Sequence, residues 1–298
     1  MNYRTDLALE RTVYPGGLGE GVTVQRQQEG AAEVTWVRVQ TESAAQRLGK
    51  PVGTYWTLTD PRLPEFSPQE RTEAARRIAQ MLRLMLPPEG NVLVLGLGNR
   101  RMTADALGDR VVSGVLVTRH MQEFVDDGKL RSVCALSPGV MGVTGLESAE
   151  MAQSLVERLR PSAVLVVDAL AAMETSHIGA AVQLTDAGIH PGSGVGNHRT
   201  GITADILGVP VVAIGIPMVV YASTIVRDAL TGILSADAAP EEAHRMAEQL
   251  TQQAHTDLVV TPRNIDEMVA GLADMLALAI NSALQPSCSM EELSQYLH

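Results

Sequence analysis

The fold is decided by the stretch NVLVLGLGN at residues 91–99 together with three similar apolar runs, VVSGVLV at 111–117, SAVLVVDAL at 162–170 and VPVVAIGIP at 209–217. None of these runs alternates apolar and polar residues, which is typical of strands that are buried on both faces of a sheet. The helical pattern ESAEMAQSLVERLR precedes the third run and supplies the crossover of a βαβ unit. We therefore expect a three-layer α/β/α core over about residues 90–235, built on a mostly parallel sheet.

The segments on either side of this core have different patterns. Residues 20–60 alternate apolar and polar positions around turn-like residues, which predicts a β-rich N-terminal section. Ser67 followed by a proline and by Glu70 predicts the start of a helix over about 68–86, with a capping box. Residues 239–297 carry the periodicity of helices and predict a helical C-terminus.

Composition excludes several classes of function. The chain of 298 residues carries 23 Lys and Arg against 34 Asp and Glu, a net charge of −11, so we expect no direct nucleic-acid binding. Cys134 and Cys288 have no metal-ligand spacing, which predicts neither a zinc site nor a redox pair. No long uncharged apolar stretch and no signal-peptide pattern occurs, so we expect a cytoplasmic protein without a membrane segment.

The Gly-x-Gly turn at the end of the first apolar run resembles a dinucleotide fingerprint only in part. The third glycine position is Arg101, so we expect no nicotinamide cofactor, and no other cofactor is indicated. The more informative residue is Asp105, which follows the carboxyl end of the strand, where open α/β sheets bind ligands. A second interpretation is that Asp105 belongs to a short helix whose N-cap is Thr103.

Asp168 directly follows five apolar residues of a predicted buried strand. A carboxylate there is costly to desolvate unless it has partners or a task, although it could also cap the next segment or pair with an arginine. Two strand-end carboxylates in one sheet can share a proton, so that one takes a proton from water while the other protonates a leaving amine. This chemistry makes Asp105 and Asp168 candidate catalytic residues.

The loop LTDAGIHPGSGVGNHRTG at 184–201 is rich in glycine and predicts a specialised conformation. Its glycines Gly192, Gly194 and Gly196 could present backbone N–H groups to a substrate carbonyl, as in an oxyanion hole. His190 could bind substrate, form a structural hydrogen bond or fill space. A plain structural loop remains an equal alternative.

Several longer strings carry a family resemblance. The order RTDLALE, GLGN, TADALG, LVTRH, SPGVMGVTGLE, VVDALA, DAGIHPGSGVGN and LGVPVVAIGIP resembles the germination proteases of spore-forming bacteria, from residue 4 to about 234. This resemblance implies an atypical aspartic endopeptidase, acting in the forespore and spore core, that starts the degradation of small acid-soluble spore proteins at germination. It places the catalytic pair at Asp105 and Asp168, and it implies a homotetramer.

The resemblance also implies a zymogen that cuts itself near its N-terminus. The expected site has an acidic residue, an apolar one, a small one and then a further acid, a pattern that Thr5-Asp6-Leu7-Ala8-Leu9-Glu10 matches. We therefore expect cleavage between Asp6 and Leu7, with residues 1–6 as a short propeptide and 7–298 as a single peptidase domain. The alternative is a frayed terminus without a regulatory role.

A metal-dependent enzyme is the rival interpretation. The fold that the resemblance implies is similar to that of hydrogenase maturation proteases, in which corresponding acids and a histidine bind nickel. Asp105, Asp168 and a histidine such as His190 could form a site of that kind, since two carboxylates and an imidazole suit a divalent transition metal. No spacing in the sequence demands such a site, and we expect no bound metal.

Overall fold

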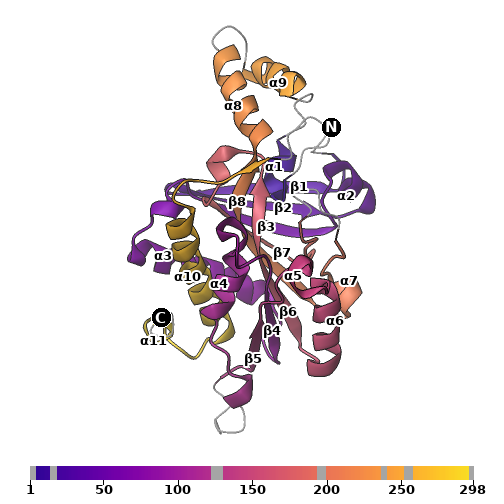
Figure 1. Ribbon diagram of the computed structural model, residues 1–298, viewed down its shortest axis with the longest axis vertical. Helices are drawn as coiled ribbons and strands as arrows, with labels where there is room; N and C mark the ends of the chain where they lie inside the picture. Colours follow the sequence, from indigo (N-terminus) through magenta and orange to yellow (C-terminus); the bar gives the residue numbers. More distant parts are fainter. Residues whose placement is uncertain are drawn as a thin grey trace.

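A computed structural model describes residues 5–13, 19–121, 130–192, 199–235, 240–251 and 258–294. Within these ranges the strands form one nine-stranded sheet in the order β1-β2-β3-β7-β8-β6-β4-β5, with β9 paired to β8 (Figure 1). The strands are β1 Val22–Glu29, β2 Ala32–Val39, β3 Gly53–Thr59, β4 Val92–Gly96, β5 Val133–Leu136, β6 Ala163–Ala172, β7 Ala181–Thr185, β8 Val211–Tyr221 and β9 Val259–Val260.

The expected α/β class is confirmed, and the sheet is mixed. Its core strands β5, β4, β6 and β8 are parallel neighbours, as the continuous apolar runs indicated. The β-rich N-terminal section adds β1, β2 and β3 as antiparallel strands, and they join the core through β7, which is antiparallel to β8. The N-terminal strands therefore extend the core sheet.

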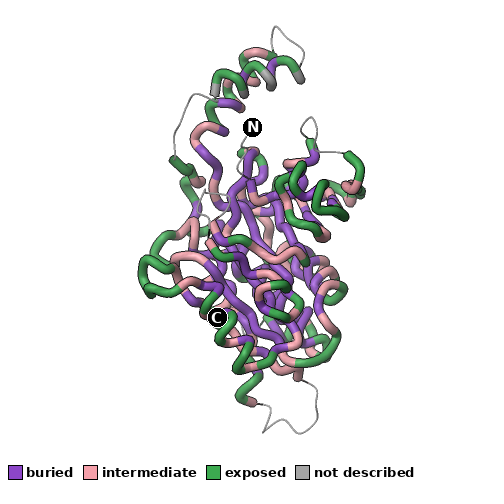
Figure 2. The backbone as a smooth tube through the Cα atoms, turned by 90° about the vertical axis from the view of Figure 1, so that its right-hand side faces the viewer, coloured by how far each residue is buried: buried purple, intermediate pink, exposed green. Residues whose placement is uncertain are grey.

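Helices cover both faces of the core sheet, so the expected three layers are present (Figure 1). One face packs against α3 Pro68–Met85, α4 Leu107–Ser113 and α10 Ile265–Leu284. The other face packs against α6 Ser148–Leu159 and α7 Ala204–Leu207. Figure 2 shows the consequence, with buried sheet residues at the centre and exposed helix faces outside.

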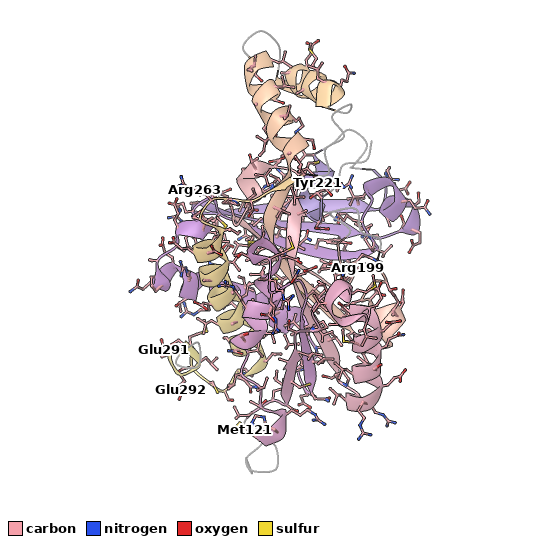
Figure 3. The ribbon with its side chains drawn as sticks, in the orientation of Figure 1. Met121, Arg199, Tyr221, Arg263, Glu291 and Glu292 are labelled. Atoms are coloured by element: carbon pink, nitrogen blue, oxygen red, sulfur yellow. The ribbon has the colours of Figure 1, made fainter. Side chains whose placement is uncertain are left out.

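The remaining helices are shorter or lie at the ends of the molecule. They are α1 Ala8–Thr12, α2 Glu42–Leu48, α5 Met141–Thr144, α8 Ala222–Leu234, α9 Pro240–Thr251 and α11 Met290–Ser294, with the 3-10 helices η1 Leu63–Glu65, η2 Thr103–Asp105, η3 Arg119–Met121 and η4 Thr175–His177. Strand β8 ends at Tyr221, where α8 begins (Figure 3), and α8 and α9 project away from the sheet (Figure 1).

The capping box predicted for α3 is confirmed. The Ser67 hydroxyl accepts a hydrogen bond from the Glu70 N–H, and the Glu70 carboxylate accepts one from the Ser67 N–H at 2.9 Å. These two bonds satisfy N–H groups that a helix start leaves without partners. The helix therefore begins at the residue that the sequence indicated.

The strand predicted over 111–117 is wrong. Val111 lies in α4, which ends at Ser113, and Val115 lies in the turn that follows the helix. Both side chains are buried in the core. The chain then turns at Gly114, where the Asn281 side chain of α10 donates to the Gly114 carbonyl and accepts from the Leu116 N–H, both at 2.8 Å. The strand that pairs with β4 at this edge is β5 instead.

Helix α10 is long and apolar enough to cross a membrane, judged by length and composition alone. In the structure, 83% of its apolar window is buried, and the helix packs against α3 and α4. This burial is typical of the core helix of a globular protein.

Candidate active site

The glycine turn after β4 places Asp105 against the carboxyl end of the sheet. Gly98 has a φ of +106°, and a Cβ there would lie 1.9 Å from the Asp105 carbonyl oxygen. Glycine is therefore required both by the left-handed backbone and by the close approach of η2. The turn therefore serves this close approach.

Asp105 is the last residue of η2, and its carboxylate stabilises the glycine turn that follows β4. Its Oδ2 accepts a hydrogen bond from the Asn99 N–H at 2.8 Å. Burial raises the pKa of Asp105, while the Asn99 hydrogen bond and the charge of Arg199 oppose that rise. The interpretation of Thr103 as an N-cap is wrong, because η2 follows Met102 without a side-chain cap.

Asp168 lies in β6, between the parallel strands β4 and β8, and only 7% of it is exposed. Its Oδ1 accepts a hydrogen bond from the Ala169 N–H at 2.9 Å. Its neighbour on β8 is Gly215, where a Cβ would lie 2.7 Å from the Asp168 carbonyl oxygen. Burial raises the pKa of Asp168 well above its usual value, and the charges of Asp105 and Asp6 raise it further.

The charges of Asp105 and Asp6 both act on Asp168, so the two carboxylates that the sequence singled out lie within electrostatic reach of each other. Like charges in a low-dielectric site oppose one another's ionisation, which raises the pKa of the more deeply buried carboxyl. Asp168 is the more deeply buried member and feels the charges of both Asp105 and Asp6. Of the two, the Asp168 carboxyl therefore has the larger rise in pKa.

The N-terminal segment Thr5–Thr12 lies in the fold instead of fraying. The Asp6 N–H donates to the Ala171 carbonyl at 2.9 Å, and the Asp6 carboxylate accepts from the Ala171 N–H at 2.9 Å. Leu7 and Ala8 are fully buried, Leu7 beside Leu170 of β6. The interpretation of this end as a frayed terminus is wrong for the residues that the structure describes.

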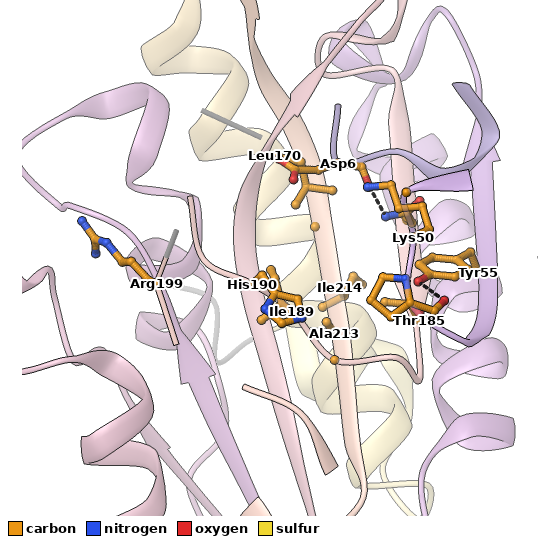
Figure 4. Close-up of a pocket in the computed structure, with 15 residues that line it drawn as sticks. Asp6, Lys50, Tyr55, Leu170, Thr185, Ile189, His190, Arg199, Ala213 and Ile214 are labelled. Carbon is orange, nitrogen blue, oxygen red and sulfur yellow. Dashed lines mark hydrogen bonds between the residues drawn. The ribbon is translucent and has the colours of Figure 1, made fainter. Parts of the chain in front are cut away.

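A cavity of about 220 Å³ opens beside Asp6 (Figure 4). Lys50 and Tyr55 lie on one side of it and Arg199 on the opposite side, and Gly215 also contributes to its wall. Neither Asp105 nor Asp168 lines the cavity, although Gly215 is the strand neighbour of Asp168. The cavity is thus lined by Asp6, Lys50 and Arg199, and it reaches the strand neighbour of Asp168.

Lys50 is a site residue that the sequence reasoning missed. Its Nζ donates to the Thr5 carbonyl at 2.9 Å. Burial lowers its pKa to about 8, and the charge of Asp6 opposes that fall. No motif marks Lys50, because it lies in a loop and reaches the site only through the pairing of β3 with β7.

The glycine-rich loop is described only in part. His190 lines the cavity, and a Cβ on Gly201 would lie 2.6 Å from its ring. Burial lowers the pKa of His190, and the charge of Lys50 lowers it further, which favours a neutral ring. Gly192 has a φ of +73°, whereas Gly194 and Gly196 lie outside the described residues.

The rival metal site needs three ligands that converge. In the part of the chain that the structure describes, no three His, Cys, Asp or Glu side chains gather so that they could hold a metal ion. His190 therefore does not form such a group with Asp105 and Asp168. The described donor set therefore does not fit the rival interpretation.

Comparison with known proteins decides the family. A family model described as Germination protease matches residues 17–239, which is most of the chain. The chain belongs to the germination protease family. It is 38% identical to a germination protease of Caldanaerobacter subterraneus subsp. tengcongensis, over all of this chain and 99% of the relative. It is 32% identical to a germination protease of Priestia megaterium, over 98% of this chain and 94% of that relative.

Membership in this family makes the chain a peptidase of spore germination, as the sequence strings indicated. A solved structure, a [NiFe] hydrogenase maturation protease HycI from Thermococcus kodakarensis KOD1, also matches at 18% identity with a TM-score of 0.30. That match covers 58% of this chain and 97% of the other. At this TM-score it bears on neither the fold nor the site.

The close approach at Gly98 predicts a large effect of one methyl group. Gly98→Ala should lower the free energy of unfolding by about 2–5 kcal/mol, since it adds a backbone clash to an unfavourable φ. Gly30→Ala is the matched control, because Gly30 also has a positive φ of +68° but nothing within 4 Å of a Cβ. Urea unfolding of both variants measures the difference, and equal losses would contradict the assignment.

The raised pKa of Asp168 predicts a gain in stability when its charge is removed. The folded protein binds this proton more tightly than the unfolded chain, so stability falls as pH rises through the folded-state pKa. Asp168→Asn should therefore raise Tm at neutral pH, by roughly 2–4 °C for each kcal/mol relieved, with no gain near pH 4. Thermal unfolding at both pH values measures this, and a lower Tm at neutral pH would contradict it.

Proposed function

We propose that the chain is an aspartic-type endopeptidase in which Asp105 and Asp168 jointly activate a water molecule. The single observation that carries the proposal is that Asp105, in η2 after β4, acts electrostatically on Asp168, which lies inside β6, with the pKa of each raised by burial. Asp168 is thus not at the end of its strand, contrary to what the sequence indicated. Acids with perturbed pKa values in a shared site are the groups that acid–base catalysis requires. The proposal gives the family's peptidase activity a chemical basis in this chain.

In the proposed mechanism the two aspartates share one proton, and each has a different role. Asp105, as carboxylate, takes a proton from water while the water oxygen attacks the carbonyl carbon of the scissile bond. Asp168, as carboxylic acid, donates a hydrogen bond to the carbonyl oxygen and stabilises the negative charge that develops on that oxygen. The C–N bond then breaks as a proton passes to the leaving nitrogen, so that water is added across the bond.

The substrates proposed are the small acid-soluble spore proteins, degraded at germination in the cytoplasm of the forespore and spore core. Support comes from the relatives, which are named germination proteases and align with nearly the whole chain. The cationic groups Lys50 and Arg199 beside the cavity suit a peptide with an acidic residue before the cut. We also propose a homotetramer, on the resemblance alone.

We further propose that the first substrate is the chain's own Asp6–Leu7 bond, so that the protein is made as a zymogen. The Asp6 charge raises the pKa of Asp168, so the segment lies within electrostatic reach of the proposed pair. The carbonyl of that bond, Asp6 O, accepts a hydrogen bond from Gln183 Nε2 at 2.9 Å. A carbonyl held in this way has a defined orientation, which catalysis needs.

The dyad predicts that each aspartate is needed. Asp105→Asn and Asp168→Asn should each lower kcat for an acid-apolar-Ala-x-Glu peptide by about 10²–10⁴-fold, while Asp109→Asn on α4 should retain activity. Circular dichroism and Tm verify that the variants fold. A chelator should have no effect on the unaltered protein. Undiminished activity in either aspartate variant would contradict catalysis by the aspartate pair. Loss of activity with a chelator would favour the metal-dependent rival.

Self-cleavage predicts one new terminus. On incubation of the full chain under mildly acidic conditions, intact mass spectrometry should show loss of Met1–Asp6 and a product that starts at Leu7. Asp168→Asn should keep the full mass under the same conditions. A product that starts at another residue, or the same product from Asp168→Asn, would contradict self-cleavage at this bond.

A further inference from the structure

The glycine-rich loop after β7 is closed at its base by a pair of backbone hydrogen bonds. Ile189 and Ile202 each donate an N–H to the carbonyl of the other, at 3.0 and 2.8 Å. A Cβ on Gly188 would lie 2.4 Å from the Ile202 carbonyl oxygen, so the two stems of the loop are in close contact. The base of the loop is therefore a fixed part of the fold, and the residues next to it have a defined place.

This loop base lies on the face of the sheet to which Asp168 belongs. Side chains of a strand alternate between its two faces, and in β6 Val164 and Val166 pack on the face that α6 and α7 cover. The pairing of β6 with β8 is regular through this part of the strand, so Asp168 falls on the same face. The two isoleucines of the loop base pack in the same cluster as these valines. The loop therefore packs on the side of β6 from which Asp168 projects.

Arg199 comes from this loop, is half-buried and lines the cavity of about 220 Å³. Leu170 lines the cavity too, and it lies two residues after Asp168 on the same face of β6. Gly215, the strand neighbour of Asp168, is a further part of the wall. Figure 4 shows Arg199 across the cavity from Lys50. Two positions next to Asp168 thus share the cavity wall with Arg199.

The charge of Arg199 acts on both aspartates. It opposes the rise that burial causes in the pKa of Asp105, and it does the same for Asp168. Lys50 is a second cation in the described wall of the cavity, but its charge acts on Asp6 and on His190 instead. The two cations therefore have different partners, and Arg199 is the one that serves the proposed catalytic pair.

Other titratable side chains around the cavity do not replace this cation. The charge of Asp6, in the N-terminal segment, raises the pKa of Asp168 and so opposes Arg199. Burial lowers the pKa of His190, on the loop itself, which favours a neutral ring. Burial also raises the pKa of Tyr55 in β3, so its hydroxyl stays neutral. Among the described residues around the cavity, Arg199 is therefore the one whose positive charge favours ionisation of the aspartate pair.

We propose that Arg199 is a positioning residue of the peptidase, whose charge keeps one carboxylate of the Asp105–Asp168 pair ionised so that it can take a proton from water. The inference rests on the proposed function, in which one aspartate is the base. Burial alone disfavours the charged form of both carboxyls, so the base needs a compensating cation. A guanidinium suits this task because it keeps its charge at every pH at which aspartates titrate.

A contact between Arg199 and the acidic residue of a substrate would have a different kinetic effect. An interaction that is equally strong in the ground state and the transition state changes KM and leaves kcat unaltered. A change in the ionisation of the pair instead moves the pH at which kcat rises, because the pH profile of kcat reports the acid and base of the bound complex. The two roles of the guanidinium are therefore separable by measurement.

The pH profile of kcat for the peptide TDLALERT, the sequence of residues 5–12, tests the inference. A cation favours the charged form of a carboxyl, so Arg199→Gln should raise the pKa of both aspartates. We expect both limbs of the profile to move to higher pH by about one unit, with a loss of about tenfold in kcat on the acidic side. Arg199→Lys keeps the charge and should return the profile to within about 0.3 of a unit.

Arg101→Gln is the matched control. Arg101 is an exposed cation four residues before Asp105, and its charge contributes to the pKa shift of neither aspartate. The profile of this variant should stay in place, and circular dichroism with Tm verifies that each variant folds. A profile of Arg199→Gln that falls in height without moving would overturn the inference. A higher KM with unaltered kcat at every pH would do the same, as would an equal shift in Arg101→Gln.

Titration of the aspartate carboxyls separates this inference from the proposed function. With carbon-13 in these carboxyls, the NMR signals missing from Asp105→Asn and Asp168→Asn identify the pair, and Arg199→Gln should move their titration to higher pH. If this shift occurs but the unaltered protein cleaves no peptide at any pH, the peptidase chemistry is wrong and the charge coupling stands. If the peptide is cleaved but neither the titration nor the profile moves, the peptidase stands and the role of Arg199 is wrong.

Discussion

The burial of Asp168 inside β6 is the constraint on which the rest of the structure depends. A carboxylate in the middle of a parallel sheet loses its hydration, and the apolar strand around it offers only the Ala169 N–H in return. Burial therefore raises its pKa, which is the property that the proposed mechanism assigns to the acid of the pair. Gly98 and Gly215 make this arrangement possible, because each lets another backbone come closer than a side chain would allow.

The same edge of the sheet receives the N-terminal segment. Ala171 pairs with Asp6 three residues after Asp168, and the turn beyond β6 receives Glu10. One strand therefore contributes a proposed catalytic acid, a backbone partner for the segment and the start of a carboxylate pocket. This continuity explains how a bond in the segment can be held in register with the carboxylates, since a β-strand is stiff over this length.

Three acidic side chains have three different environments here. Glu10 accepts hydrogen bonds from two backbone N–H groups and lies against His177. Asp105 has an N–H donor and intermediate exposure, whereas Asp168 is buried and feels the charges of Asp105 and Asp6. The number of N–H donors and the depth of burial therefore distinguish a carboxylate suited to binding from one suited to acid–base catalysis. A charged carboxylate without donors is costly in a low dielectric.

The sequence by itself determined the layered α/β core and the start of α3, because these depend on local patterns of apolar residues and caps. The same patterns made Asp168 a candidate catalytic residue, since it follows a run of apolar strand residues. It misplaced a strand at 111–117, where helix and strand patterns coincide over a few apolar residues. No local pattern marks Gln183, because the backbone groups that it binds, at Asp6 and Ala8, lie far from it in the chain. Only the tertiary structure decided that Glu10 meets His177, since residues so far apart in the chain are brought together by strand order, which local sequence does not encode.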